Sequence, residues 1–211
     1  MTIDYLCLMQ SLKLITKYKA DGRRQRSVNT QATIVDAMMI LIKKGILEPT
    51  AQQVADEAGL GIRTVFRIVK DKETLFSRMD EKVRESNQML YQASPSGSLK
   101  DRIEGLMQIE SKGYEVNIEF IKATLANKWK YKTLEENYKK NQLLLKKLMF
   151  TWLPEISQLD SNLQEFLTAI NSPNFWIELR ENQTLSVEKA KKIKEAEFKK
   201  ALGSLRQDLK L

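Results

Sequence analysis

Residues 50–75 read TAQQVADEAGLGIRTVFRIVKDKETL, and this stretch decides the fold that the sequence predicts. Thr50 precedes Gln53 by three residues, the spacing of a capping box that satisfies free backbone amides at the start of a helix. Ala55 is small enough for a second helix to cross close to the first. Gly59 can adopt the positive φ that ends a helix and turns the chain. The stretch therefore predicts two short helices joined by a glycine turn.

The second of these helices is predicted to expose a basic face. Leu60, Val65 and Ile68 recur at helical spacing, so we expect them to face the core together with Val54. Asp71 is positioned to cap a third, longer helix that supports the pair. The residues left on the outer face of the second helix are Gly61, Ile62, Arg63, Phe66 and Arg67.

Two helices that present a basic edge in this way fit the major groove of DNA, so we predict a DNA-reading helix-turn-helix. An arginine side chain can bond bidentately to guanine O6 and N7, and each such pair contributes roughly 1 to 3 kcal/mol of discrimination. Arg63 is the first candidate for this contact. An ordinary αα-hairpin with solvated arginines is the alternative interpretation. Residues expected to hold backbone phosphates are Thr50, Lys72 and three arginines of a basic arm, Arg23, Arg24 and Arg26. For that arm, a solvated and disordered charge run is an equal alternative.

Composition narrows the function classes. The chain has 211 residues, 42% of them hydrophobic, and a formal net charge of +8 with a pI near 9.4, which favours a polyanionic partner. A single cysteine, Cys7, excludes an internal disulfide and a cysteine-based zinc finger, and the absence of histidine removes ordinary zinc and haem sites. No nucleophile and base arrangement or phosphate-binding glycine loop is recognisable. We therefore expect no enzyme and no cofactor. Without a signal peptide or a long apolar run, we also expect no membrane association and a cytoplasmic location.

The breaks in the chain predict an all-α protein in three parts. Residues 1–28 form an N-terminal extension and basic arm, with residues 1–18 left unassigned, residues 29–76 a helix-turn-helix domain, and residues 77–211 a larger helical domain. A helix over 29–44 is expected to brace the two short helices, and the support helix from about 72 is expected to reach about 93. In the larger domain the expected helices cover 99–112, 119–128, 133–153, 161–170, 173–180 and 186–209. The last is amphipathic, as a core helix or a subunit interface would be.

Two segments of the sequence resemble the TetR family of bacterial transcription regulators. The closer match is GRRQRSVNTQATIVDAMMILI (22–42) followed by PTAQQVADEAGLGIRTVFRIVKDKETLF (49–76), and the looser one is SPNFWIELRENQTLSVEKAKKIKEA (172–196). The resemblance implies a DNA-binding domain of three helices and a C-terminal domain for ligand binding and dimerisation. It also implies a repressor that binds a palindromic double-stranded DNA operator as a homodimer and is released by a small-molecule effector.

The resemblance also implies roles for individual residues. Thr50 and Lys72 match positions that meet phosphates, whereas Arg63 and Arg67 match positions that reach base edges or phosphates. Thr64 and Phe66 match the Thr and Tyr of the family's T-x-Y run. Phe66 lacks the tyrosine hydroxyl, so it can pack against a sugar or a thymine methyl but cannot donate to a phosphate. Gly61 stands where a capping serine is common, which costs a few tenths of a kcal/mol.

The C-terminal domain carries two weaker predictions. Its aromatic residues can line a ligand pocket or simply form core, and core is the more common use, so no ligand-contacting residue is assigned. The aromatic residues in question are Tyr91, Tyr114, Phe120, Trp129, Tyr131, Tyr138, Phe150 and Trp152. From the resemblance, the expected dimer interface comprises Phe166, Phe175, Trp176, Leu179, Phe198, Leu202 and Leu205. The alternative function is a helical protein-interaction module whose basic surface binds acidic partners without reading DNA sequence.

Overall fold

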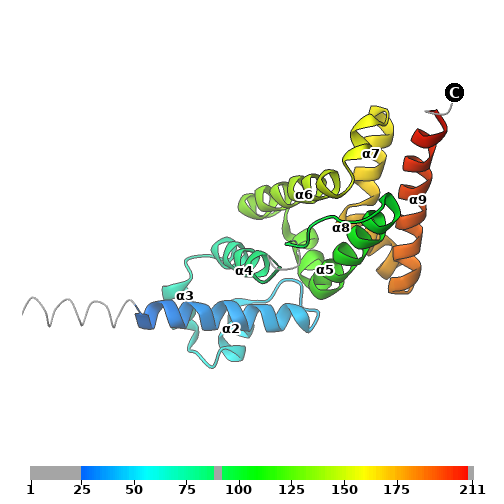
Figure 1. The fold of residues 1–211 in the computed structure, drawn as a ribbon. Coiled ribbons are helices and arrows are strands. Elements are labelled where there is room, and N and C mark those ends of the chain that lie inside the picture. Colours follow the sequence, from blue (N-terminus) through cyan, green and yellow to red (C-terminus); the bar gives the residue numbers. More distant parts are fainter. Residues whose placement is uncertain (1–24, 88–91, 209–211) are drawn as a thin grey trace, which may run out of the picture. The chain divides into compact units, whose positions relative to one another are not determined.

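The computed structural model describes residues 25–87 and 92–208, and every regular element in these ranges is helical (Figure 1). The prediction of an all-α fold is thus confirmed. The chain divides into two compact units, Met1–Met79 and Asp80–Leu211. Helix α4 (Lys72–Asn87) begins in the first unit and ends in the second.

The first unit is a set of helices around one apolar core. A helix over residues 25–43 is followed by α2 (Ala51–Glu57), α3 (Ile62–Ile68) and the first turns of α4. The helix predicted over 29–44 thus starts earlier than expected. One face of this helix is buried, together with apolar residues of the other three helices. The buried residues are Ile34, Val35, Ala37, Met38, Leu41, Ile42, Val54, Ala55, Val65, Val69, Leu75, Phe76 and Met79.

The local signals in residues 50–75 produce the structure that they predict. The Thr50 side chain accepts a hydrogen bond from the Gln53 amide, and the Gln53 side chain accepts one from the Thr50 amide. Gly59 has φ of +64°, a conformation that costs a residue with a Cβ roughly 1 to 2 kcal/mol. The Asp71 carboxylate accepts a 2.7 Å bond from the Thr74 amide at the start of α4. These caps and the turn fix where α2, α3 and α4 begin and end.

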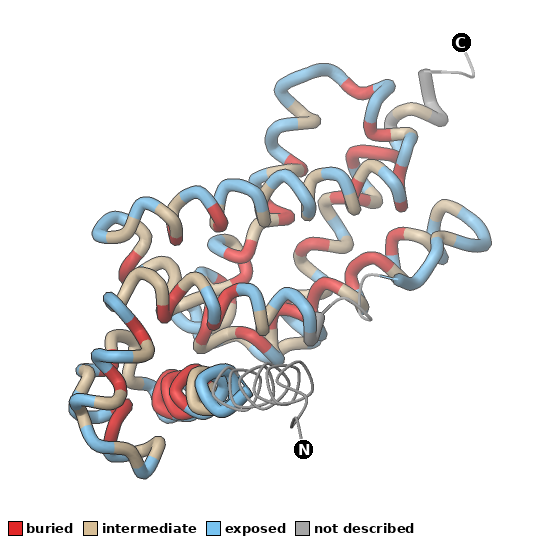
Figure 2. The backbone as a smooth tube through the Cα atoms, turned by 90° about the vertical axis from the view of Figure 1, so that its left-hand side faces the viewer, coloured by how far each residue is buried: buried red, intermediate tan, exposed pale blue. Residues whose placement is uncertain are grey.

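The second unit consists of longer helices. Its elements are α5 (Leu99–Asn127), α6 (Lys132–Trp152), the 3-10 turn η2 (Pro154–Gln158), α7 (Ser161–Ile170), α8 (Pro173–Ile177), the π-helical turn η3 (Glu178–Asn182) and α9 (Val187–Asp208). Helix α5 contacts α6, α8 and α9, and α7 contacts α8 and α9. Figure 2 shows buried positions recurring along these helices.

Two predicted boundaries in this region are wrong. The sequence suggested a break between residues 112 and 119, but α5 is continuous for 29 residues and Gly113 is buried within it. Buried side chains recur along the length of α5, so tertiary packing outweighs the weak helix propensity of one glycine. The helix expected to reach residue 93 is no longer helical at residues 92–96, and residues 88–91 lie outside the described part of the chain.

The main core of the second unit includes a close approach between a glycine and a tryptophan. A Cβ atom added to Gly105 of α5 would lie 2.5 Å from Cζ3 of Trp152, at the end of α6. Trp152 belongs to the same apolar core as Ile103, Leu106 and Phe198. Gly105 therefore supplies the space that lets α6 end against α5.

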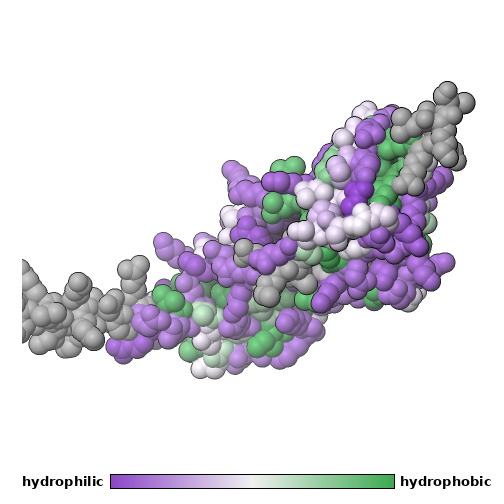
Figure 3. Space-filling view, in the orientation of Figure 1, coloured by the Kyte–Doolittle hydropathy of each residue, from purple (hydrophilic) through white to green (hydrophobic). Residues whose placement is uncertain are grey.

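The outer surface is mainly hydrophilic on the face that Figure 3 shows, with smaller apolar patches. Along the helices that the structure describes, none is both long enough and apolar enough to span a membrane.

Candidate nucleic-acid interface

Helix α3 is anchored to the first unit by one face only. Val65 is buried, and Leu60 and Ile68 are half-buried, as the helical spacing predicted. Ala55 of α2 is fully buried, and α2 and α3 contact each other. Gly61 is the N-cap residue of α3 and makes no side-chain cap, as expected for a residue without a side chain. The anchoring leaves the other face of α3 to the solvent.

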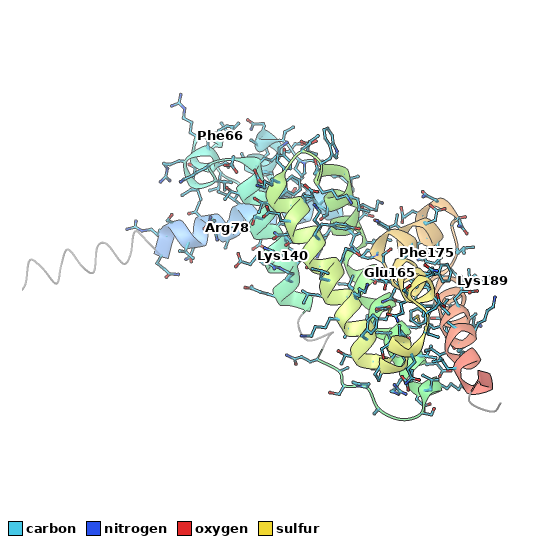
Figure 4. The ribbon with its side chains drawn as sticks, turned by 90° about the horizontal axis from the view of Figure 1, so that it is seen from above. Phe66, Arg78, Lys140, Glu165, Phe175 and Lys189 are labelled. Atoms are coloured by element: carbon cyan, nitrogen blue, oxygen red, sulfur yellow. The ribbon has the colours of Figure 1, made fainter. Side chains whose placement is uncertain are left out.

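The solvent-facing side of α3 carries the predicted reading residues. Arg63 and Arg67 are exposed, and Phe66 is 58% exposed. Figure 4 labels Phe66 on this helix. Ile62 and Thr64 are half-buried at the edges of this face. Within the described ranges, neither Arg63 nor Arg67 forms a hydrogen bond or an ion pair. Two guanidinium groups and one aromatic ring are thus exposed on one short helix, and neither guanidinium group has a partner among the described residues.

The predicted phosphate contacts differ in their availability. Thr50 is exposed at the N-terminus of α2, where backbone amides and the helix dipole favour an anion. Lys72 at the start of α4 forms a 3.2 Å ion pair with Glu48, and both side chains are about one-third exposed. This pairing was not predicted, because the two residues are 24 positions apart and no local pattern links them. A phosphate at Lys72 must compete with the Glu48 carboxylate.

The basic arm falls mostly outside the described residues. Arg23 and Arg24 lie there, so their predicted contacts stay predictions. Arg26 is exposed within the helix over residues 25–43, and its carbonyl accepts a bond from the Thr30 hydroxyl. Arg26 is thus helical and not part of a disordered charge run, and its predicted contact with DNA stays a prediction. A helix at this point begins before Asn29, where the sequence pattern had placed its start.

The residues of the predicted dimer interface differ in their burial within the chain itself. Trp176, Leu179, Phe198 and Leu202 are buried within the cores of the chain itself, where they pack against residues of the same chain. The amphipathic stripe of α9 was ambiguous between core and interface, and for Phe198 and Leu202 it is core. Phe166 on α7 is exposed, and Phe175 and Leu205 are half-buried. These three keep their place in the interface prediction.

The aromatic residues singled out in the second unit differ in their burial. Tyr114, Phe120 and Trp152 are buried, whereas Trp129 is 75% exposed beyond the end of α5. Tyr131, Tyr138 and Phe150 are half-buried, and Tyr91 lies outside the described residues. In the ranges 25–87 and 92–208, no group of three His, Cys, Asp or Glu side chains is placed to hold a metal ion.

Comparisons with known proteins relate this fold to transcription regulators. No protein-family model matches the chain, and no curated protein matches it significantly. A transcriptional regulator from Rhodococcus sp. Rha1 superposes with a TM-score of 0.62 at 13% identity, covering 84% of this chain and 96% of its own. The multidrug binding protein EbrR, solved with imidazole, gives 0.56 at 15% identity, with 79% and 93% covered. A protein from Mesorhizobium loti MAFF303099, assigned to the TetR family of transcriptional regulators, gives 0.55 at 17% identity, with 85% and 98% covered. The chain thus has the helical fold of TetR-type transcriptional regulators.

Proposed function

We propose that the protein is a DNA-binding transcription regulator that reads base edges with α3. The carrying observation is the exposed face of α3, where Arg63, Phe66 and Arg67 stand in solvent while Val65 anchors the helix. Exposed arginines that have no partner in the described part of the chain retain their full capacity for bidentate bonds to guanine. A rigid helix also holds them at fixed spacing, which base recognition requires. The similarity to solved transcriptional regulators supports the same function.

Backbone contacts would supply most of the affinity. In our proposal, Thr50, Gly61, Ile62 and Thr64 frame the reading face, and Lys72 binds phosphate after leaving Glu48. The net charge of +8 strengthens attraction to any duplex without selecting a sequence. Binding should therefore weaken steeply as salt rises, with a slope that reports the number of phosphates neutralised.

The regulatory part of the proposal rests on the second unit. We propose that two copies associate through a surface that includes Phe166, Phe175 and Leu205, so that two α3 helices read a palindromic operator. We further propose that the protein is a repressor, and that a small molecule binding the second unit releases the DNA. EbrR, which has a similar fold, is a multidrug binding protein. A ligand shifts such an equilibrium only by the difference between its affinities for the two states.

Selection of bound fragments from a random DNA pool tests the proposal. The purified full chain should enrich an inverted repeat whose half-sites lie about one helical turn apart or a multiple of it. Light scattering on the same sample should give the mass of a dimer, 2 × 24.4 kDa. Recovery of no common sequence would refute specific reading and favour a nonspecific basic surface. Recovery of a single half-site by a monomer would refute the dimeric arrangement.

A further inference from the structure

The second unit contains a fully buried ion pair that the sequence analysis did not anticipate. Lys194 of α9 is 1% exposed, and its Nζ lies 3.1 Å from Oε2 of Glu110 on α5, which is 0% exposed. The other carboxylate oxygen of Glu110 accepts a 2.6 Å bond from the side-chain amide of Asn171. Burying a charge costs free energy unless its surroundings compensate it, so an ion pair in a core needs well-placed partners for both groups.

Two aromatic rings complete the surroundings of the ammonium group. Nζ of Lys194 lies 5.1 Å from the centroid of the Tyr114 ring and 5.8 Å from that of Trp176. The rings are tilted by 43° with centroids 5.8 Å apart. A carboxylate together with the negative faces of aromatic rings is the combination that recognises organic cations. Lys194 thus supplies a primary ammonium ion to a site whose chemistry suits that ion.

The walls of this site are held by contacts that do not involve Lys194. The Tyr114 hydroxyl donates a 2.7 Å bond to the Asn171 carbonyl, and the Trp176 indole donates a 2.8 Å bond to Glu115. Arg180 binds both oxygens of Glu115 at 2.8 and 3.1 Å. Although burial raises the pKa of Glu115, the bonds from Arg180 and Trp176 hold it below its ordinary value, so the anchor stays charged. Removing the Lys194 ammonium therefore leaves an organised site.

The site also has unused binding capacity. Oδ1 of Asn171 is buried and accepts no hydrogen bond from any described residue, although the nitrogen of the same amide donates to Glu110. An ammonium group has three donors, and one of those on Lys194 is used by Glu110. Burial raises the pKa of Glu110, and Lys194 and Asn171, which lower it, compensate only in part. A better coordinated cation would stabilise this carboxylate further.

We propose that Glu110, Asn171, Tyr114 and Trp176 form a binding site for organic ammonium ions, which Lys194 occupies as a tethered ligand and from which an external alkylammonium ion displaces it. Displacement would put an unpartnered ammonium on α9, which packs against α5 and α7, so α9 must shift until Lys194 reaches water. This ligand class for the effector rests on the proposed function, but binding itself is measurable without DNA.

Truncating Lys194 tests whether the site accepts a free ion. Lys194→Ala removes the atoms of n-propylammonium from the site, so n-propylammonium chloride should raise the melting temperature of this variant saturably. The matched control Lys194→Ala/Glu110→Gln keeps the shape and removes the anion, and 1-propanol keeps the alkyl chain and removes the charge. We expect at least about tenfold weaker binding in both cases, since each loses a charge-assisted hydrogen bond. Equal binding by 1-propanol, or equal binding of the ammonium ion by the Glu110→Gln control, would overturn the proposal.

The wild-type protein provides a second test that does not depend on folding of the truncated variant. Titration with n-propylammonium chloride should shift the indole NMR signal of Trp176 saturably, whereas those of Trp129 and Trp152 stay in place. The affinity should be at least about tenfold weaker than in Lys194→Ala, because a tethered competitor has a high effective concentration. No saturable shift in the wild type would refute displacement of Lys194. A shift without any DNA preference would refute the regulator and leave the ammonium site standing.

Discussion

On α3 of the first unit, Arg63 and Arg67 face solvent without a partner among the described residues, whereas in the second unit Lys194 and Glu110 are buried against each other. Charges of the first kind keep their binding capacity for another molecule, and their loss costs the fold little. Charges of the second kind already compensate each other inside the protein. Loss of one leaves the other buried without a counterion, which destabilises the fold. The same residue types therefore serve recognition in one unit and internal organisation in the other.

The largest effect is expected from removing one member of the buried pair. Lys194→Met keeps an unbranched apolar side chain, one atom shorter, but leaves Glu110 buried without its counterion, so the free energy of unfolding should fall by about 3 to 5 kcal/mol. Urea denaturation of both proteins measures this difference. The double variant Glu110→Met/Lys194→Met should be more stable than Lys194→Met alone, because no buried charge remains. A double variant at least as unstable as the single one would show that packing, and not the charge, dominates.

DNA recognition should be sensitive to a substitution on α3 that leaves the stability of the fold almost unchanged. Arg63→Ala should remove roughly 1 to 3 kcal/mol from the difference in binding free energy between the selected operator and an operator with one base pair changed. The free energy of unfolding should change by less than about 0.5 kcal/mol. Competition binding at fixed salt measures the first quantity. Lys140→Ala is the matched control. Lys140 is an exposed residue of α6 in the second unit (Figure 4), so its substitution also removes one positive charge but lies outside the reading helix. Equal effects of the two substitutions would indicate attraction by net charge alone.

Two helical glycines differ in the space around them. Gly105→Ala places a Cβ 2.5 Å from the Trp152 ring, so overpacking should destabilise the protein by about 1 to 3 kcal/mol. Gly203 on α9 has no atom within 4 Å of the equivalent position, and Gly203→Ala should stabilise by up to about 1 kcal/mol through helix propensity. Thermal unfolding of the two variants distinguishes the effect of a steric clash from the effect of helix propensity. Destabilisation by both would mean that helix α9 is constrained in a way its open surroundings do not indicate.

The two units also differ in how far sequence could predict them. Thr50, Gly59 and Asp71 act on backbone atoms within a few residues, so their roles could be predicted from spacing alone. Glu110 and Lys194 are 84 positions apart, and only the packing of α5 against α9 brings them together. A lysine on an amphipathic helix normally lies on its solvated face, which is why the buried pair was missed. For Phe198 the same long-range packing decided between core and interface.

A buried carboxylate outside the main ion pair should limit stability at neutral pH. Desolvation raises the pKa of Asp80 on α4, and Arg84, Asn141 and Asn137 lower it only in part. Its Oδ2 lies 3.6 Å from Nε of Arg84 and, in the part of the chain that the structure describes, accepts no hydrogen bond. A raised folded-state pKa means that the unfolded chain ionises first, so this group costs stability increasingly as pH rises through the interval above about 3.9.

Asp80→Asn should therefore stabilise the protein by about 1 kcal/mol at pH 7 and have little effect at pH 3, where Asp80 is protonated in both states. Denaturation across this pH range gives the difference curve. A curve that rises toward acid pH instead would show that the pair with Arg84 outweighs desolvation.

A still weaker change concerns the cap of the reading helix in the first unit. Gly61 is the N-cap of α3, with φ of −67° and nothing within 4 Å of the position that a Cβ would take, so a serine fits without strain. Gly61→Ser should add a cap to the orphan amides of α3 and stabilise the unit by a few tenths of a kcal/mol, which urea denaturation measures. Gly59→Ala is the contrasting change, because φ of +64° makes it costly despite equal space. If Gly61→Ser instead weakens operator binding while it stabilises the fold, the bare backbone at position 61 serves close approach to DNA rather than capping.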